Sequence, residues 1–523
     1  MRNLRTRLVL ATATMLVVSC AQQPPELVDT DTQTAGTLET QLGKITGKVI
    51  DSATGQVQSF QGIRYAQPPT GAARFLRPQA SKAWSGTLDA TTPAAQCPQA
   101  PRLGDTNTPQ AEDCLFLNIV TPSSQGKPRP VLFWIHGGAY TQGSADDYDG
   151  SVLAAQGDVV VVTINYRLGL LGFAGLGSLS SEFDGAASNG FRDQILALQW
   201  VRDNITDYGG DPSNVTIFGN SAGGGSVLAL LAAPSADGLY HKAIAHSPTN
   251  THLPSQDMVP MLVDHLKVDR AGLAAKLRDL PVTEIVQLQQ TAGQTGGTVD
   301  GTVVTRSTNE AIADRGNAGV PLIAGSNLDE GKAFTMLLPE AVWSTLGPGL
   351  ALTVTSGADP SAYLQALATS YPDDTPKQNN ERIWVDMFRH SAIATAQRAT
   401  QAGPGGWLYQ FNLPSTKPIN GVQLGAPHGA ELAFTFNTFA AGKTLLLDLY
   451  DATDPMVTDL ARRWSDTIIA FAKTGNPNGA GLPDWPRYAK DSRKTLVLDR
   501  NTRVVADVNR KHLLLWESVD AAP

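Results

Sequence analysis

The segment 215–231 constrains the fold of this chain more than any other. It begins as an apolar, β-branched run (Val215–Phe218), continues through a G-x-S-x-G turn centred on Ser221 and ends in an apolar stretch (Gly224–Leu231). This order predicts a buried strand, a tight turn and a buried helix. Small residues around the serine permit a strained turn, and the first amides of the helix point at negative charge that develops there. Ser221 is therefore the candidate nucleophile.

Other segments predict an α/β fold with a large, mostly parallel central sheet flanked by helices. Val131–Ile135 and Val159–Ile164 are continuous apolar runs, typical of strands buried on both faces. Helical patterns such as Gln194–Val201 and Trp464–Ala472 lie between strand-like runs, so βαβ units repeat along the chain. The 523 residues exceed the roughly 250–300 of one ordinary core. Because no repeat or long linker follows residue 37, we expect residues 38–523 to form one large domain.

The first residues predict export. Three arginines precede the apolar run Leu8–Val18, which is too short to cross a bilayer and is typical of a signal peptide. Residues 16–20, Leu-Val-Val-Ser-Cys, resemble a bacterial lipobox, so we expect removal of residues 1–19 and acylation of Cys20. An ordinary signal peptide with a chance cysteine is the alternative. The polar residues 20–37 predict a flexible tether, and the chain is expected in the bacterial cell envelope or secreted.

Charge and cysteine content exclude several classes of function. The chain has 40 basic and 48 acidic residues, a net charge of −8, which argues against nucleic acid as a partner. Besides Cys20 it has Cys97 and Cys114, whose short separation predicts a disulfide in an exported protein. The eight histidines form no H-E-x-x-H pattern, so we expect no metal and no cofactor. A membrane contact is expected only through a lipid on Cys20.

A second glycine-rich turn follows the strand-like run Val131–Ile135. It reads H-G-G-A-Y (136–140), the kind of loop that supplies backbone N–H groups to an oxyanion. Gly138 and Ala139, together with Ala222 directly after the nucleophile, are the candidate oxyanion donors. The alternative is a plain glycine turn.

The base is expected to follow both the nucleophile and the acid along the chain. Histidines before Ser221 or soon after it are thereby excluded. His390 lies in a helical pattern, and His512 lies beside an apolar run near the C-terminus. His428 lies in a small-residue loop after the strand-like Trp407–Phe411, and we therefore choose it as the base.

The acid should also follow a strand. After the strand-like Pro321–Gly325 the chain offers two neighbouring carboxylates, Asp329 and Glu330. Spacing alone does not separate them.

Several further motifs carry a resemblance to a known family. They are FQGIRYAQPP (60–69), EDCLFLN (112–118), NYRLG (165–169), NGFRDQ (189–194), the segment 464–478 and WP (485–486). With them, roughly residues 40–516 resemble the type-B carboxylesterases of the α/β-hydrolase fold, which include para-nitrobenzyl esterases, liver carboxylesterases and cholinesterases. The resemblance implies Ser221 as nucleophile, Glu330 as acid, His428 as base and a Cys97–Cys114 disulfide.

Two positions depart from the pattern of that family. Asn220 stands where the family commonly has Glu, and Ala139 replaces a frequent third Gly. Neither change removes a member of the triad. Both alter the field and the space around a bound acyl group.

The expected reaction is hydrolysis of a small-molecule carboxylic ester through an acyl-enzyme. The regions 249–317, expected as loops and helices over the edge of the sheet, and 336–375 should shape the substrate pocket. Lipases, amidases and acyltransferases use the same residues, and some relatives of this fold are adhesion modules without a working triad. On the sequence, these alternatives remain open.

Overall fold

The structure is a computed structural model. It describes residues 34–101, 108–124, 126–251, 253–292, 296–315, 319–336, 339–355, 359–443, 445, 447–508, 510 and 516. The expected signal peptide (1–19), Cys20 and His512 lie outside these residues.

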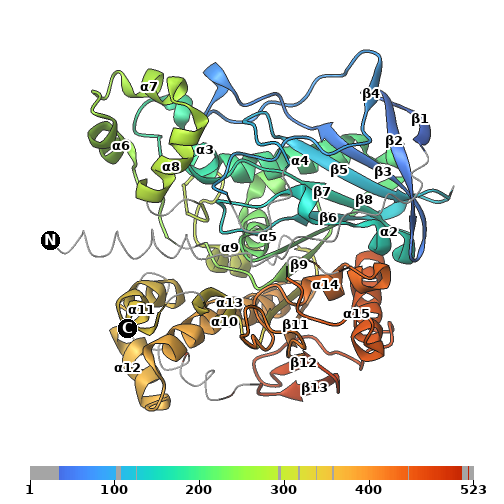
Figure 1. The fold of residues 1–523 in the computed structure, drawn as a ribbon, viewed down its shortest axis with the longest axis vertical. Coiled ribbons are helices and arrows are strands. Elements are labelled where there is room, and N and C mark those ends of the chain that lie inside the picture. Colours follow the sequence, from blue (N-terminus) through green and yellow to red (C-terminus); the bar gives the residue numbers. More distant parts are fainter. Residues whose placement is uncertain are drawn as a thin grey trace.

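One large sheet runs through the molecule and carries helices on both faces (Figure 1). Its 13 strands follow the order β1-β2-β3-β5-β7-β6-β8-β9-β10-β11-β12-β13, and β4 pairs with β2 outside this path. Neighbours from β7 to β12 are parallel, whereas the pairs at both ends are antiparallel. The strands are β1 Thr34–Thr40, β2 Gly43–Ser52, β3 Gly55–Arg64, β4 Thr87–Asp89, β5 Phe116–Pro122, β6 Arg129–Ile135, β7 Val160–Ile164, β8 Gly210–Asn220, β9 Lys242–His246, β10 Leu322–Asn327, β11 Gly406–Phe411, β12 Lys494–Leu498 and β13 Arg503–Ala506.

The helices form a layer on each face of the sheet. One apolar core joins the sheet to α4, α5, α9 and α13, and a second core joins it to α2, α14 and α15. The α-helices are α2 Ser151–Gly157, α3 Gly169–Phe173, α4 Asn189–Asn204, α5 Ala222–Ala232, α6 Val259–Leu266, α7 Leu273–Asp279, α8 Val282–Ala292, α9 Thr308–Arg315, α10 Lys332–Thr335, α11 Glu340–Val354, α12 Ser361–Ser370, α13 Pro376–Ala402, α14 Leu432–Thr435 and α15 Pro455–Thr474.

The central strands are buried on both faces, as their uninterrupted apolar runs predict. Every residue of Val131–Ile135 in β6 and of Val160–Ile164 in β7 is buried. Helices cover both faces, so the alternation of apolar and polar residues seen in half-exposed strands is missing. The sheet therefore anchors the loops at its carboxyl edge rigidly.

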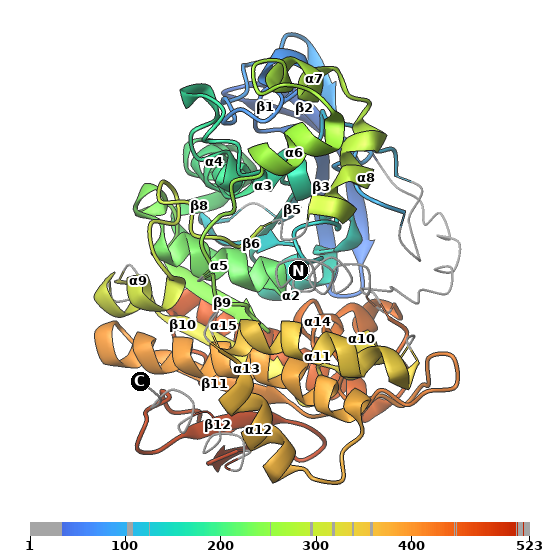
Figure 2. The same ribbon diagram turned by 90° about the vertical axis from the view of Figure 1, so that its left-hand side faces the viewer.

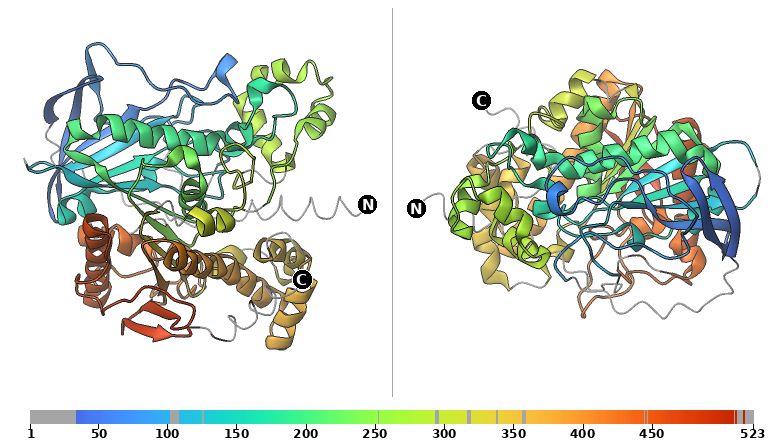
Figure 3. Two further views of the ribbon diagram at one scale, coloured as in Figure 1. Left: turned by 180° about the vertical axis from the view of Figure 1, so that it is seen from behind. Right: turned by 90° about the horizontal axis from the view of Figure 1, so that it is seen from above.

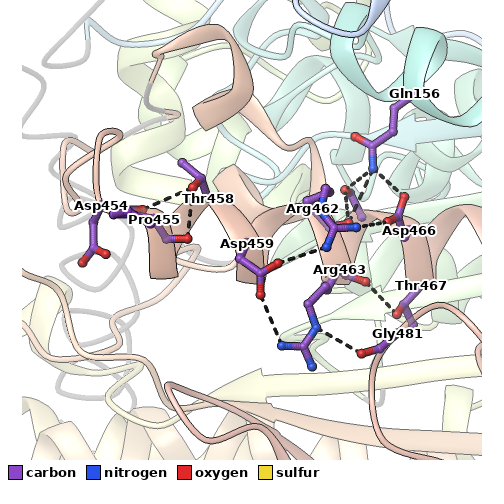
Figure 4. A network of polar contacts seen from close by, with 11 residues as sticks. Gln156, Asp454, Pro455, Thr458, Asp459, Arg462, Arg463, Asp466, Thr467 and Gly481 are labelled. Carbon is purple, nitrogen blue, oxygen red and sulfur yellow. Dashed lines mark hydrogen bonds and ion pairs between the residues drawn. The ribbon is translucent and has the colours of Figure 1, made fainter.

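Helix α15 separates apolar from charged residues around its axis. Its buried side chains include Val457, Leu460, Trp464, Ile468 and Phe471. On the outer side Arg462 pairs with Asp459 (3.0 Å) and with Asp466 (3.1 Å), at helical spacings of three and four residues (Figure 4). Gln156 of α2 donates to Asp466 (2.7 Å), so the same polar network joins α15 to α2.

Two long excursions leave the sheet at the carboxyl ends of its central strands. The chain between β9 and β10 holds α6–α9, and the chain between β10 and β11 holds α10–α13. Helices α6, α7 and α8 form one group and α11 and α12 another (Figures 1 and 2), and both lie at one end of the molecule when seen from above (Figure 3). Helices α9 and α13 return to pack against the sheet layer.

The ordered domain begins earlier than the predicted boundary between the tether (20–37) and the domain. Residues 34–37, the end of the segment predicted as a flexible tether, belong to β1, which pairs with β2 through contacts such as Thr37 with Thr46. Backbone pairing with β2 orders these polar residues, and composition does not reveal such a partner. The remainder of that segment lies outside the described residues.

Cys97 and Cys114 form a disulfide, and both are buried. No helix in the described ranges is long and apolar enough to span a bilayer.

Candidate active site

The carboxyl ends of neighbouring parallel strands meet at one edge of the sheet. The register aligns Ile135 with Gly219, Asn220 with His246, and Asn327 with Phe411. Residues that directly follow β6, β8, β9, β10 and β11 are thereby collected at one place, which is where open α/β sheets place their sites.

Ser221 lies in a strained turn between β8 and α5. Its backbone has φ 60° and ψ −123°, a combination rarely adopted outside glycine. A Cβ at Gly219 would lie 2.7 Å from Ile135 O, and one at Gly223 would overlap the same oxygen. A Cβ at Gly219 would also lie 2.6 Å from the backbone of Gly223, so the two glycines of G-x-S-x-G are required by the close approach of β6 and by their own contact across the turn. The Ser221 N–H donates to His246 O (3.0 Å), which holds the turn against β9.

The H-G-G-A-Y loop lies directly against this turn. A Cβ at Gly137 would lie 3.2 Å from Ser221 Cβ and 2.7 Å from the carbonyl oxygen of Asn220. Gly138 and Ala139 both have positive φ, 104° and 54°. Ala222 is the first residue of α5 and is buried. The three candidate oxyanion donors thus come from two segments that meet at Ser221.

Glu330 and His428 are in direct contact. Glu330 follows β10 and is fully buried, and its Oε2 lies 2.5 Å from His428 Nδ1. Its Oε1 accepts hydrogen bonds from Ser247 Oγ (2.6 Å) and from the Asn327 N–H (2.7 Å). These two donors fix the carboxylate so that its other oxygen faces the imidazole.

The alternative candidates lie elsewhere. Asp329 Oδ2 accepts from the Ala426 N–H (2.9 Å), and its Oδ1 pairs with Lys332 (2.8 Å). Asp329 therefore braces the loop before the histidine and does not face the ring. His390 lies on α13 beside Trp516, with ring centroids 5.3 Å apart.

Aromatic rings enclose the imidazole of His428. The ring of Phe388 stacks on it at a centroid distance of 4.5 Å, and that of Phe334 lies at 5.1 Å. Trp384 stacks on Phe334 at 4.3 Å and extends this apolar wall. Nε2 of His428 is buried and has no hydrogen-bond partner among the described residues, Ser221 included. An unpaired, buried ring nitrogen is suited to accept a proton from a hydroxyl that approaches it.

Two hydrogen-bonded links connect the Ser221 turn to Glu330 and to the loop of His428. Ser247 donates to Glu330, and the carbonyl just before Ser247 accepts the Ser221 N–H. Asn220, directly before Ser221, donates from Nδ2 to Glu431 Oε1 (3.1 Å), three residues beyond His428. The fold therefore brings together three segments that are far apart in the sequence.

Burial shifts three titratable groups around this cluster. Burial and the neighbouring Glu330 raise the pKa of Glu431 to about 7. Burial lowers the pKa of His246 to about 3, so its ring is neutral, with Nδ1 at 2.6 Å from the hydroxyl of Tyr409. Burial also lowers the pKa of Arg389 to about 10, which leaves a buried cation on α13.

Sequence reasoning did not single out four residues that the structure places in this cluster: Ser247, Asn327, Arg389 and Glu431. Ser247 and Asn327 lie at the ends of strands, and that position was the one available signal. Nothing local distinguishes Glu431 or Arg389 from other charged residues, because their place in the site depends on packing between distant segments. Within the described part of the chain, no group of three or more His, Cys, Asp or Glu side chains could hold a metal ion.

Comparisons with known proteins agree with this architecture. The model of the Carboxylesterase family matches residues 34–516. The chain is 36% identical over 497 residues to para-nitrobenzyl esterase of Bacillus subtilis (strain 168), covering 90% of this chain and 96% of that relative. It is 34% identical over 524 residues to cocaine esterase of Homo sapiens, covering 91% and 90%.

Solved structures give the same result. A PNB esterase superposes with a TM-score of 0.78 at 31% identity, covering 92% of this chain and 99% of the other. A Geobacillus stearothermophilus carboxylesterase superposes with a TM-score of 0.78 at 32% identity, with the same coverage.

The sheet, its helical layers and these neighbours define an α/β-hydrolase fold. The chain belongs to the carboxylesterase family and is a carboxylic ester hydrolase. The family and the fold that the sequence motifs predicted are thus confirmed.

Proposed function

We propose that Ser221, Glu330 and His428 are the catalytic triad with which this chain hydrolyses small-molecule carboxylic esters. The observation that carries the proposal is the contact between Glu330 Oε2 and His428 Nδ1 (2.5 Å), with the other ring nitrogen unpaired. This arrangement supports a tautomer with the hydrogen on Nδ1 and with Nε2 as the proposed proton acceptor. The strained backbone of Ser221 supports the same assignment, because such strain is concentrated at functional sites.

The reaction then follows from the chemistry of these groups. His428 takes the hydroxyl proton of Ser221 as Oγ attacks the ester carbonyl carbon, and Glu330 stabilises the imidazolium that forms. The carbon–oxygen bond to the alcohol breaks, and the alcohol leaves with the proton from His428. Water repeats the attack on the acyl-enzyme, which releases the acid and restores Ser221.

The backbone N–H groups of Gly138, Ala139 and Ala222 are the proposed donors to the tetrahedral oxyanion. Their segments lie against each other at the nucleophile turn. Preorganised donors of this kind stabilise charge that is absent from the bound ester, and losing one typically costs about 10²–10³ in rate.

The expected substrates are esters with short to medium acyl chains. Two similar proteins carry the names of ester substrates, para-nitrobenzyl esters and cocaine. The wall formed by Phe334, Phe388 and Trp384 offers apolar surface next to the histidine. Rates on para-nitrophenyl esters of increasing acyl length test this expectation. Faster turnover of long-chain emulsions would contradict it and favour a lipase.

Titration with a fluorophosphonate tests the triad. We expect one label per chain, located on the peptide with Ser221, and no label in Ser221→Ala. Ser178→Ala is the control, because Ser178 is an exposed serine outside the proposed triad, and this variant should label normally. A wild type that binds esters but takes no label is a non-catalytic binding module. Turnover of a matched anilide, or acyl transfer to an added alcohol, faster than ester hydrolysis would instead define an amidase or an acyltransferase.

We further propose that the chain is exported and held at a membrane by a lipid on Cys20. The support is the sequence pattern of residues 1–20, together with the Cys97–Cys114 disulfide, which suits an oxidising compartment. In this proposal residues 1–19 are removed and the tether comprises residues 20–33. Expression in bacteria with a labelled fatty acid should label the wild type and not Cys20→Ala. An unlabelled, secreted wild type would indicate an ordinary signal peptide.

A further inference from the structure

Glu431 is buried in the site and takes no part in the proton transfers described above. It is fully buried and directly precedes α14. Its Oε1 accepts from Asn220 Nδ2 (3.1 Å), and its Oε2 accepts from Asn327 Nδ2 (2.5 Å). Placing a carboxyl group so deep costs free energy even when it is hydrogen bonded. The two amides that it contacts indicate what the group does.

These amides belong to the segments that carry the nucleophile and the acid. Asn220 directly precedes Ser221, and the Asn327 N–H donates to Glu330 Oε1 (2.7 Å). The Asn327 side-chain amide also donates to Pro427 O (2.7 Å), directly before the histidine. One carboxyl group and one amide therefore contact all three segments of the proposed triad.

We propose that Glu431 is a positioning residue that holds these three segments in register by accepting one hydrogen bond each from Asn220 and Asn327. The inference rests on the proposed function, because register matters only if the three segments act together. Both carboxyl oxygens serve as acceptors. Asn220 and Asn327 donate to different carboxyl oxygens. A glutamine side chain would replace one of these oxygens with an NH₂ group, so it could accept from only one of the two partners in this geometry.

The charge of Glu431 links this role to pH. The titratable groups that face it are Glu330, His428, Tyr409 and Tyr450. Burial and Glu330 raise the pKa of Glu431 to about 7, so its carboxyl group ionises near neutral pH. Ionisation strengthens its two amide hydrogen bonds and adds a second negative charge near the imidazole.

A double-mutant cycle tests the role. Asn220→Asp keeps the side-chain size and places a second carboxyl group 3.1 Å from Glu431 Oε1. We expect kcat at pH 8 to fall by about 100-fold with little change in KM, because two buried carboxylates repel. The deficit relative to wild type should shrink as the pH falls and the pair shares one proton.

The partner variant Glu431→Gln should lower kcat by about tenfold, because one of the two amides loses its acceptor. In the double variant the introduced glutamine can donate to the introduced aspartate and still accept from Asn327. We therefore expect Glu431→Gln to rescue Asn220→Asp, so that the double variant exceeds the single aspartate variant in kcat by about tenfold.

Asn204→Asp is the matched control. Asn204 is another buried amide, at the end of α4, and its Nδ2 donates to Trp200 O (2.9 Å). This change should lower stability without altering the pH profile of kcat/KM, and Glu431→Gln should not rescue it.

Three outcomes overturn the inference. They are additive effects of the two substitutions, a double variant no better than Asn220→Asp, and a Glu431→Gln enzyme with the kcat and pH profile of wild type. The last measurement suffices if Asn220→Asp does not fold. Fluorophosphonate labelling separates the two proposals: an unlabelled wild type refutes the triad, whereas normal labelling of Ser221 without coupling refutes only the role of Glu431.

Discussion

Two fully buried carboxylates in this molecule, Asp193 and Glu330, have opposite kinds of partner. Asp193 on α4 accepts from the backbone N–H, Nε and Nη2 of Arg167, at 3.0, 2.8 and 2.7 Å. The Arg167 side chain is itself only 2% exposed. Glu330 faces His428, whose second ring nitrogen has no partner within the described chain.

The difference separates a structural carboxylate from one that we propose takes part in the chemistry. The pair of Asp193 and Arg167 is complete in the resting protein, and its two segments, NYRLG and NGFRDQ, are joined by it. In the proposed mechanism, His428 becomes a cation beside Glu330 when it takes the proton of Ser221. The charge of Asp193 is therefore already balanced by Arg167. The charge of Glu330 is available to stabilise a positive charge that would form on His428 during the proposed reaction.

Glu330→Gln should have the largest effect on activity and a small effect on stability. The amide keeps an acceptor for Ser247 and the Asn327 N–H, but it presents N–H groups to His428 Nδ1 and favours the wrong tautomer. We expect kcat to fall by about 10⁴, as in other triads that lose the acid in this way. Calorimetry should show a nearly unchanged unfolding temperature. A kcat within tenfold of wild type would remove Glu330 from the triad.

Asp193→Asn should have the reverse effect. It leaves the buried guanidinium of Arg167 without its carboxylate, which should cost about 3–5 kcal/mol of unfolding free energy, measured with urea. Activity per folded molecule should stay near wild type. Asp459→Asn is the control, because its pair with Arg462 is exposed and should contribute less than about 1 kcal/mol. Equal losses at both sites would contradict the comparison.

A third buried carboxyl group, that of Glu431, extends the comparison to the pH dependence of stability. Its pKa is raised from 4.5 to about 7 in the folded chain, so the folded state binds the proton more tightly than the unfolded state. Its contribution is fully present below pH 4.5 and is lost as the pH rises through 7. The difference in stability between wild type and Glu431→Gln should therefore fall by roughly 3 kcal/mol across that window. Denaturant unfolding at several pH values measures it, and a difference that rises with pH contradicts the assignment.

The smallest effect is expected from backbone strain. Ala139 in the candidate oxyanion loop has φ 54°, and Gly169, next to the ion pair, has φ 52°. Ala139→Gly should stabilise the chain by up to about 1 kcal/mol, because the left-handed backbone no longer carries a Cβ. Gly169→Ala should destabilise it, since a Cβ at this positive φ is strained and the Gln289 side chain would also have to move aside. Thermal unfolding compares the two, and a loss of stability in Ala139→Gly would show that its methyl group packs favourably.

The elements that sequence patterns predicted carry either a continuous apolar run or apolar residues at helical spacing. The predicted strand Val131–Ile135 lies within β6, and the predicted helix Gln194–Val201 lies within α4. The polar strand β1 was missed, because only its pairing with β2 orders it. Register, rather than composition, decides whether such a segment is a strand.

The candidate site divides in the same way. Spacing left Asp329 and Glu330 equivalent, and the resemblance to a family favoured Glu330. In the structure Asp329 bonds the Ala426 N–H while Glu330 contacts His428. The side chains of neighbouring residues point in different directions, so Asp329 and Glu330 contact different parts of the structure although they are adjacent in the sequence.

What the sequence determined by itself is the strand–turn–helix around Ser221, because its requirements are local: small residues around Ser221, an apolar strand before it and an apolar helix after it. What the tertiary structure decided is which carboxyl group faces His428, and the placement of Glu431 between Asn220 and Asn327. Those contacts join residues about 100 to 200 positions apart in the chain. They exist because the parallel strands of the sheet end at one edge and bring the loops that follow them together.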